Sequence, residues 1–570
     1  MQGEAARRGL PLAVGGVREG LVAGLITACA LALRLLGVGR GLPYLHEWDE
    51  VFVLPHVITM VRDHTLNPGI FFYGTLYYYL LCPVVYAHAL YLHARGILPS
   101  IQDVVLAHPL VPGYLWYLSV PSFYFWARAF TAMLGAATVY LVYRLGDAAF
   151  GRPVGLLAAA LLAAAPGAVY YADTVRVDVP EAFFTTAALL AGLGVLRRGR
   201  RRDYLAAGLL TGLAISTKQT AIWLLAPLVT AHVFNERRTV FVDAALACMA
   251  LGVIAGGVLG TPYALFHPGE VWAGFTWHTE SYGLLALPWP AEYLSKLGLN
   301  LAYLVWPIQG GDWYIVPHAG IGLLPGIAAL AGVVVGFRRQ RSVQRYLVAF
   351  PLVQLLFLAR ANVFYTRNLM PVLPLVSIWA ALGAVWAWER AARRTPPWWR
   401  GSPRSWRSAA AAVGIAILLI GPAWESAALG WWLYSHRDTR TQAVEWLRRH
   451  VPRGAAVAFE LELAWYLPDL DGLPFRMEWT DRRTPLSWYS EKRIAYAAVS
   501  EWNPVNVCPA AKFFPRPPYL PSVAQEAKFV PDSYPIIDPA VAIVRPRARC
   551  PSTAPAQSGP GRLPVVRFRR

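Results

Sequence analysis

The chain has 570 residues, of which 56% are hydrophobic and 15% are charged, and its formal net charge is +19. Soluble proteins are roughly 45–50% apolar and about 25% charged. The composition therefore excludes a soluble enzyme, a disulfide-stapled domain and a disordered regulator, and it indicates a membrane protein. Because the basic residues fall in loops between apolar stretches, they report on membrane topology and predict no nucleic-acid partner.

Apolar stretches close to the ~20 residues that cross a bilayer recur as far as residue 430 and then cease. Each predicts a transmembrane helix, and the clearest are 20–38, 124–143, 154–171, 181–196, 239–260, 318–337, 345–359, 369–388 and 409–424. Arginine-rich loops mark the cytoplasmic face, and these loops are Arg7–Arg18, Arg144–Arg152, Arg197–Arg202, Arg237–Arg238, Arg338–Arg345 and Arg390–Arg407. Because these loops share the cytoplasmic face, an even number of membrane crossings must connect each loop with the next. Residues 1–19 are thus predicted to be cytoplasmic, and 40–123 to form the first outer loop.

The stretch 204–234 would be roughly 46 Å long as one helix, which exceeds a ~30 Å hydrocarbon core. Because both its ends are basic, it predicts two short helices joined by an outward-facing apex at Ser216–Gln219. About eleven transmembrane helices then result. Residues 71–93 are apolar but rich in tyrosine and histidine, and they predict a helix along the outer interface, where such side chains prefer to lie.

The polar residues 431–570 follow the last apolar stretch and are predicted to form a small exported α/β domain. Thr439 and Gln442 fit a capping box that opens a helix ending at His450. The proline-rich end of the chain is expected to be loose. Strand-like runs follow the helix at 455–459, 494–499 and 541–544.

The expected fold is therefore an all-α polytopic membrane bundle over 20–430, with outer-face interfacial helices and the α/β domain at 431–570. None of the five cysteines has a metal-binding or redox spacing. Cys508 and Cys550 lie in the exported part, where a disulfide between them and two free thiols are both open alternatives.

Polar residues far apart in the sequence are predicted to meet on the outer face. Ionisable groups at membrane depth cost several kcal/mol unless they are paired or lie in water-filled cavities, so they are candidate functional residues. They are Asp49 with Glu50, Asp178 with Arg176 and Asp173, Lys218, His278 with Glu280, and Arg367 with Tyr365.

Structural roles compete with this interpretation. Asp49 and Glu50 could be a solvated pair that caps a helix, and an Asp two residues before Pro180 is also a common cap. A lysine at a hairpin apex can snorkel to the surface, and an arginine that begins a span can anchor it at the interface. For His278 and Glu280 the favoured interpretation is a wet outer loop.

Several segments, taken in chain order, resemble the bacterial branch of glycosyltransferase family 39. They are the Asp49-Glu50 pair, L-N-P-G-I-F-F-Y-G-T from Leu66, R-x-F-T-A-M-L-G from Arg128, D-T-V-R-V-D-V-P-E from Asp173, G-L-L-T-G-L-A-I-S-T-K-Q-T from Gly208, L-G-T-P-Y-A-L from Leu259 and R-N-L-M-P-V-L-P-L from Arg367. That family includes the protein O-mannosyltransferases and the aminoarabinose transferase of lipid A, and it has the membrane GT-C fold. The order of the motifs is more specific than any one of them.

The resemblance implies inverting transfer of a sugar from a polyprenyl-phosphate donor to an acceptor hydroxyl on the outer face of the bacterial inner membrane. Asp49 matches the family's first-loop carboxylate at the reaction centre, and Glu50 matches its partner. Asp178 matches the second-loop acid, Lys218 the lysine that faces the donor phosphate, and Arg367 the basic residue that heads a late span.

His278 and Glu280 match a histidine-containing outer segment only loosely. The residues after 430 depart from the family, since they resemble no acceptor-binding domain of it. The acceptor therefore stays open among a lipid, a glycan and a protein, and membrane lipids are expected partners throughout.

The chemistry requires these residue types independently. Preorganised cations stabilise the charge that develops on a leaving phosphate, and we predict this role for Lys218, Arg367 and Arg176. A carboxylate must accept the proton of the attacking hydroxyl, and we predict that Asp49 does so. The acids predicted to orient the acceptor or to tune this base are Glu50 and Asp178.

A Mg²⁺ or Mn²⁺ ion between Asp49 and Asp178 is an open alternative, because carboxylates suit these ions although two acids do not establish a site. The sugar-phosphate lipid is expected to enter beside residues 71–93. Further contacts to donor or acceptor are predicted for His278, Glu280, Tyr365 and Tyr73.

A lipid or solute transporter, such as a flippase, is the main alternative, since it would also place charges inside a helical bundle. Transporters usually carry paired repeats with broken helices in corresponding positions, and the sequence shows no second copy of the 204–234 hairpin. A third hypothesis is an inactive scaffold that displays the C-terminal domain. It predicts that Asp49→Ala and Lys218→Ala leave function intact.

Overall fold

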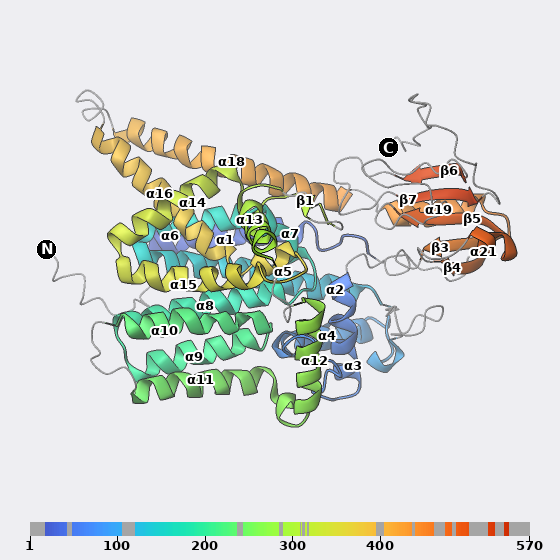
Figure 1. Cartoon of the computed structure of the whole chain (residues 1–570), viewed down its shortest axis with the longest axis horizontal. Coiled ribbons are helices and arrows are strands. Elements are labelled where there is room, and N and C mark those ends of the chain that lie inside the picture. The colour runs from blue at the N-terminus through green and yellow to red at the C-terminus, as the bar shows by residue number, and fades with distance from the viewer. Residues whose placement is uncertain are drawn as a thin grey trace.

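A computed structural model describes most of the chain (Figure 1). The described residues are 17–42, 48–104, 120–235, 243–283, 289–307, 309–310, 314–315, 318–394, 404–435, 439–460, 474–480, 486–500, 523–529 and 541–546. Helices dominate from Val17 to Ser435, and a five-stranded sheet follows.

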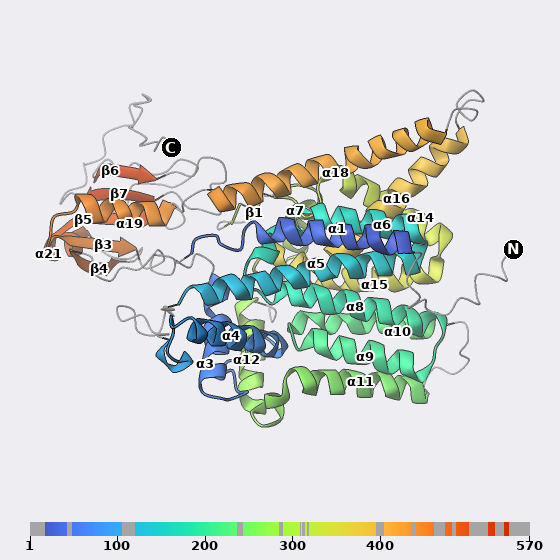
Figure 2. The same cartoon turned by 180° about the vertical axis from the view of Figure 1, so that it is seen from behind.

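A bundle of long helices forms the body of the protein, and each predicted apolar stretch coincides with one or more of its helices. In chain order they are α1 (Val17–Leu35), α5 (Ser122–Phe150), α6 (Arg152–Ala164), α7 (Pro166–Tyr170), α8 (Asp178–Arg197), α9 (Arg201–Ile215), α10 (Leu225–Val233), α11 (Ala244–Gly260), α14 (Leu323–Arg339), α15 (Arg341–Leu358), α16 (Leu373–Arg394) and α18 (Arg404–Ser435). Figure 2 shows α1, α5, α8, α9 and α11 running side by side. The predicted all-α bundle is confirmed.

Three described helices are long and apolar enough to cross a membrane, namely α5, α8 and the Ser408–Trp431 part of α18. A fourth crossing results if Arg152–Ala164 and Pro166–Asp173, which are bent by 60° at their break, count as one span. Gln219–Val233 and Ala244–Gly260 are shorter apolar helices. The larger number of crossings expected from the sequence therefore stays a prediction.

The predicted hairpin is present, because α9 is followed by a tight turn and by a 3₁₀ helix, η4 (Gln219–Leu224), that leads into α10. Glycines bring α9 and α11 into backbone contact. A Cβ at Gly208 or Gly212 would lie 2.2 Å from a carbonyl oxygen of α11, and one at Gly252 or Gly256 would lie 2.5 or 2.2 Å from a carbonyl oxygen of α9. Small residues spaced by four allow such close approach in membrane helices, and the contact fixes the depth of the hairpin apex.

Shorter elements lie between the long helices. They are α2 (Trp48–Val51), α3 (Leu54–Arg62), α4 (Leu76–Ala94), η2 (Ile101–Asp103), η3 (Tyr171–Asp173), η5 (Pro262–Leu265), α12 (Pro268–Ser281), α13 (Pro290–Val305), β1 (Gln309–Gly310), β2 (Tyr314–Ile315) and η6 (Thr366–Leu369). Figure 1 shows α2, α3, α4 and α12 at one end of the bundle, with α12 crossing the direction of the long helices. We call this end the site end.

Helix α4 covers 76–93 of the segment 71–93 that was predicted to lie along the outer interface, and residues 71–75 precede it. Tyr77 and Tyr78 are fully buried against the bundle, whereas Tyr86 and Tyr91 on the same helix are more than half exposed. The helix therefore has one face packed on protein and one aromatic face open to its surroundings. Its placement at the interface stays a prediction.

The C-terminal part is a small α/β domain, as predicted, built from α19 (Thr439–His450), α21 (Leu486–Glu491) and strands in the order β4-β3-β5-β7-β6. Strand β3 (Ala456–Glu460) pairs in parallel with β4 (Arg476–Thr480) and β5 (Ile494–Ser500), whereas β7 (Val541–Pro546) pairs antiparallel with β5 and β6 (Val523–Phe529). Its core contains Leu447, Val451, Val457 and Phe459.

Strands β3, β5 and β7 occupy the three predicted runs, and β4 and β6 are additional. Figure 1 places this domain beyond the site end, whereas the turn between α14 and α15 lies at the opposite end of the bundle. Cys508, Cys550 and the proline-rich residues 547–570 lie outside the described residues.

Candidate active site

Asp49 lies in the short helix α2, at the site end, and two arginines hold its carboxylate. Arg176 Nη1 lies 3.0 Å from Asp49 Oδ2, and Arg367 Nη1 lies 3.5 Å from the same oxygen. The side chain of Asp49 keeps 12% of its surface exposed. Asp49 Oδ1 has no hydrogen-bond partner among the described residues. One oxygen of the acid is therefore held by two cations.

Lys218, at the hairpin apex, forms a second ion-pair centre. Its Nζ donates to Asp178 Oδ1 at 2.6 Å and to Asn368 Oδ1 at 2.7 Å. Glu181 Oε2 lies 3.7 Å from the same nitrogen, and Thr220 donates to the other oxygen of Glu181 at 2.5 Å. Lys218 is buried and points into the protein, so it does not snorkel to the surface.

The two centres belong to one site. Arg367, which contacts Asp49, and Asn368, which contacts Lys218, are neighbours in η6. Likewise, Asp178 is the first residue of α8 and Arg176 lies two residues before it, and they bind Lys218 and Asp49 respectively. The structure thus brings together five residues that the sequence singled out, namely Asp49, Arg176, Asp178, Lys218 and Arg367.

Glu50, the neighbour of Asp49, is fully buried and has other partners. Arg128 of α5 binds it with two parallel hydrogen bonds, Nε to Oε1 at 2.7 Å and Nη2 to Oε2 at 2.6 Å. The backbone N–H of Val175 donates to Oε1 at 2.8 Å. Arg128 also donates to the carbonyl oxygens of Val38 and Arg40. This network joins α2, α5 and the segment before α8, and it engages both oxygens of Glu50.

Aromatic side chains border the site. The ring of His278 lies 5.1 Å from that of Tyr73 and 5.7 Å from that of Tyr282, and the rings of Tyr282 and Tyr365 are 6.0 Å apart. The guanidinium of Arg367 lies 4.2 Å from the centre of the Tyr365 ring. These rings line one side of the cation cluster.

His278 projects from α12, which lies outside the long helices. Burial, with a smaller contribution from the charge of Lys218, lowers the pKa of His278 to about 4, so its ring is neutral at pH 7. Its Nε2 is buried and has no hydrogen-bond partner among the described residues. Glu280 is exposed on the same helix, and no ion pair or side-chain hydrogen bond connects it with the described residues of the site.

The segment 71–76 holds the hairpin apex in place. The N–H of Leu76 donates to the carbonyl oxygen of Ser216 at 2.9 Å, and Gln219 Nε2 donates to the carbonyl oxygen of Phe72 at 2.8 Å. A Cβ at Gly74 would lie 2.2 Å from the oxygen of Ser216, so only glycine permits this approach. The F-F-Y-G-T run thereby fixes the apex that carries Lys218.

The acids do not form a convincing ion-binding set. Asp49 contacts Arg176 and Arg367, and Asp178 contacts Lys218, so both carboxylates are neutralised by cations of the protein. No group of three or more His, Cys, Asp or Glu residues that could hold a metal occurs in the described part of the chain. This donor set does not fit Mg²⁺ or Mn²⁺, which prefer several oxygen ligands without adjacent positive charges.

Three partners in this site were not singled out as site residues from the sequence, namely Arg128, Glu181 and Asn368. A usable signal existed for Arg128, because an arginine within an apolar span needs a buried partner. Asn368 gave no such signal, since it stands beside the more conspicuous Arg367.

Residues 107–258 match the family model described as dolichyl-phosphate-mannose-protein mannosyltransferase. The chain resembles the crystal structure of ArnT from Cupriavidus metallidurans bound to undecaprenyl phosphate, with 13% identity, a TM-score of 0.50, and coverage of 91% of this chain and 97% of that one. It is also similar to the apo oligosaccharyltransferase of Archaeoglobus fulgidus, with 12% identity, a TM-score of 0.49, and coverage of 85% and 69%. No sequence among the curated proteins matches significantly. The structural likeness shows that this chain has the fold of ArnT, the membrane GT-C fold expected from the sequence, and residues 107–258 of it match the family model.

Proposed function

We propose that the protein transfers a sugar from a polyprenyl-phosphate donor to an acceptor hydroxyl on the extracytoplasmic face, by a single inverting displacement. The observation that carries this proposal is the site itself. A partly exposed carboxylate, that of Asp49, has one oxygen without a hydrogen-bond partner in the described part of the chain, and it lies near the cations of Arg176, Arg367 and Lys218 at one end of a membrane bundle.

Asp49 is the general base of the proposed reaction. Its Oδ2 is held by two guanidinium groups, so the carboxylate has a fixed orientation and its Oδ1 can accept the proton of the attacking hydroxyl. One base suffices for a single displacement, which inverts the anomeric carbon, whereas a retaining mechanism would need a nucleophile as well. A positioned base contributes about 10²–10⁴ to the rate.

The cations stabilise the polyprenyl phosphate as it leaves. The ammonium of Lys218 donates to Asp178 and Asn368 and has Glu181 Oε2 at 3.7 Å, so it acts on the leaving phosphate through its positive charge rather than through a spare donor. Arg176 and Arg367 add further donors beside Asp49. Because these groups are held by other side chains before the donor binds, they cost little reorganisation when charge develops.

The other acids have positioning roles in this proposal. Asp178 and Glu181 lie on two sides of the Lys218 ammonium and hold it toward the site. Glu50 anchors α2 to Arg128 and so fixes the position of Asp49. His278, Tyr73 and Tyr365 form a wall for the sugar or the lipid, and no role follows from the position of Glu280.

Two observations support the donor class and the side of the membrane. The solved ArnT structure that shares this fold is described as bound to undecaprenyl phosphate, a polyprenyl phosphate. The arginine-rich ends of α14 and α16 lie at the opposite end from the site, and arginine-rich loops favour the cytoplasm. The site end and the C-terminal domain then face outward from a bacterial inner membrane. Lipid, glycan and protein acceptors all remain compatible with this geometry.

A flippase, the competing function, would move the lipid without consuming it. The described residues place the ionisable cluster at one end of the bundle rather than at its middle, which suits chemistry at one interface better than alternating access. No specific observation favours transport.

The decisive experiment follows donor consumption by the purified full-length chain in lipid nanodiscs, with polyprenyl-phosphate mannose, arabinose and related donors. Release of polyprenyl phosphate is measured for the wild type, Asp49→Asn and Lys218→Gln. We expect Asp49→Asn to lower kcat by about 10²–10⁴ and Lys218→Gln to lower it by about 10²–10³.

Asp63→Asn is the matched control, because Asp63 lies in the same outer segment but is half exposed, and its ion pair among the described residues is with its neighbour Arg62. It should consume donor at the wild-type rate. Equal rates for Asp49→Asn and the wild type would refute the proposed base. Movement of an intact donor across the bilayer without its consumption would refute glycosyl transfer altogether.

A further inference from the structure

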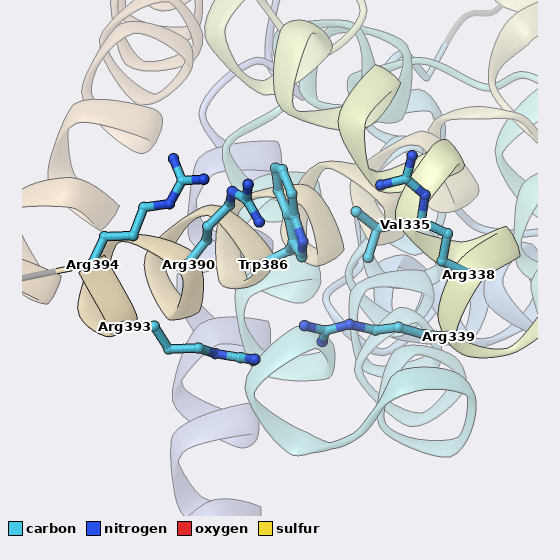
Figure 3. A pocket seen from close by; sticks show the side chains of 7 residues that line it. All are labelled: Val335, Arg338, Arg339, Trp386, Arg390, Arg393 and Arg394. Carbon is cyan, nitrogen blue, oxygen red and sulfur yellow. The ribbon is translucent and has the colours of Figure 1, made fainter.

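A pocket of about 300 Å³ lies far from the site, between the end of α14 and the end of α16. Figure 3 shows the side chains that line it. Arginines come from both helices, with Trp386 between them and Val335 on the α14 side. The arginines are Arg338 and Arg339 from α14 and Arg390, Arg393 and Arg394 from α16.

Most of this positive charge is not compensated. Glu389 pairs with Arg339, and also with Arg393 at 3.5 Å. Figure 3 shows these two arginines reaching toward one another across the lower part of the pocket. In the described part of the chain, no carboxylate lies within ion-pair distance of the other three, which are Arg338, Arg390 and Arg394. Five guanidinium groups therefore share one described carboxylate. Their remaining N–H donors can bind an anion that has several oxygen atoms.

The surroundings of the pocket are those of a membrane interface. On α14, the helix that supplies Arg338 and Arg339, the side chains of Ile327, Leu330 and Val334 are 57%, 71% and 51% exposed. They recur at intervals of three and four residues, so they form one apolar stripe along the helix. Trp386 lies in the pocket, and the guanidinium of Arg390 is 5.8 Å from its ring centre. Tryptophan with arginine is typical of the level of the lipid headgroups.

We propose that this pocket binds the phosphate headgroup of an anionic phospholipid of the cytoplasmic leaflet, with the acyl chains along the exposed stripe of α14. The guanidinium groups bind phosphate oxygens with paired N–H donors, a geometry that a phosphodiester satisfies. A basic pocket between membrane helices on the cytoplasmic side is a suitable headgroup site. The apolar stripe favours a lipid over a soluble phosphate, which has no chains to cover it.

The full-length chain, purified in detergent, is titrated with phosphatidylglycerol, with phosphatidylcholine of the same acyl chains, and with soluble glycerol phosphate, and bound ligand is counted by native mass spectrometry. The pocket variant is Arg338→Gln/Arg390→Gln/Arg394→Gln. The control is Arg200→Gln/Arg201→Gln/Arg202→Gln, which removes the same charge from another arginine-rich loop.

We expect phosphatidylglycerol to bind the wild type more tightly than phosphatidylcholine, and the pocket variant to lose about fivefold in affinity for each arginine removed. The control variant should stay within about twofold of the wild type, because diffuse charge contributes little in a detergent micelle. Arg338→Gln alone, with the expected fivefold loss, tests the proposal if the triple variant does not fold.

Equal losses in the pocket and control variants would overturn the proposal, since the affinity would then follow overall charge. Equal binding of the two phospholipids would also overturn it. Binding of glycerol phosphate as tight as that of phosphatidylglycerol would show that the pocket takes a soluble phosphate and would overturn the lipid as its source. None of these outcomes depends on transferase activity.

Discussion

The buried pair of Glu50 and Arg128 offers a test of whether Glu50 acts in chemistry or in positioning. Both side chains are about 1% exposed or less, and two parallel hydrogen bonds of 2.7 and 2.6 Å join them. Glu50→Gln leaves the Arg128 charge buried without its counter-ion. Breaking such a pair by removing one partner costs about 3–5 kcal/mol.

The double variant Glu50→Gln/Arg128→Met removes both charges. The glutamine oxygen can still accept from Val175, and the methionine fills the volume of the arginine stem, so we expect at least half of the lost stability to return. Replacing a buried ion pair by uncharged groups of similar volume is often close to neutral. The carbonyl oxygens of Val38 and Arg40 lose a donor, which limits the recovery.

Stability is measured by SDS titration in mixed micelles, and activity by donor consumption in nanodiscs. If Glu50 positions α2, the single variant loses stability and activity together, and the double variant regains both. A Glu50→Gln protein of wild-type stability that has lost activity, or a double variant that is stable and inactive, would refute the reasoning. Glu50 would then be a catalytic residue.

Three further predictions concern packing, protonation and topology. Gly208→Ala should destabilise the protein by about 1–3 kcal/mol, since its Cβ would meet the backbone of α11 at 2.2 Å, whereas Gly257→Ala, with nothing within 4 Å of its Cβ, should be close to neutral in the same SDS titration. The pKa of His278 lies at about 4 in the folded protein, below the usual 6.5. The contribution of the buried neutral ring to the free energy of unfolding is therefore complete above pH 6.5 and falls as the pH drops toward 4. His278→Gln should flatten this part of the plot of stability against pH. A plot identical to that of the wild type would contradict the assignment. An impermeant maleimide on intact cells should label Asp63→Cys but not Arg201→Cys, and the reverse pattern would invert the proposed orientation.

The positions of the helices and the existence of a polar cluster were predictable from the sequence alone. Apolar runs such as that in α8 and arginine-rich loops are both local features of the sequence. Because the arginine-rich loops lie on one face, counting the crossings between them assigns each intervening segment to a face. On that basis Asp49, Arg176, Asp178, Lys218 and Arg367 were expected to meet, and the structure places them in two neighbouring ion-pair centres, one around Asp49 and one around Lys218. The hairpin at Lys218 followed from length and basic ends.

The tertiary structure decided how the charges are partnered. The adjacent acids Asp49 and Glu50 have opposite environments, because consecutive side chains on a helical turn point about 100° apart and α5 covers only one of those directions. Arg128, 78 positions from Glu50, and Asn368, 150 positions from Lys218, become partners only when helices distant in the chain pack together. Pairing depends on these contacts and not on any local pattern, so the sequence predicted which residues gather but not which partner each charged group has.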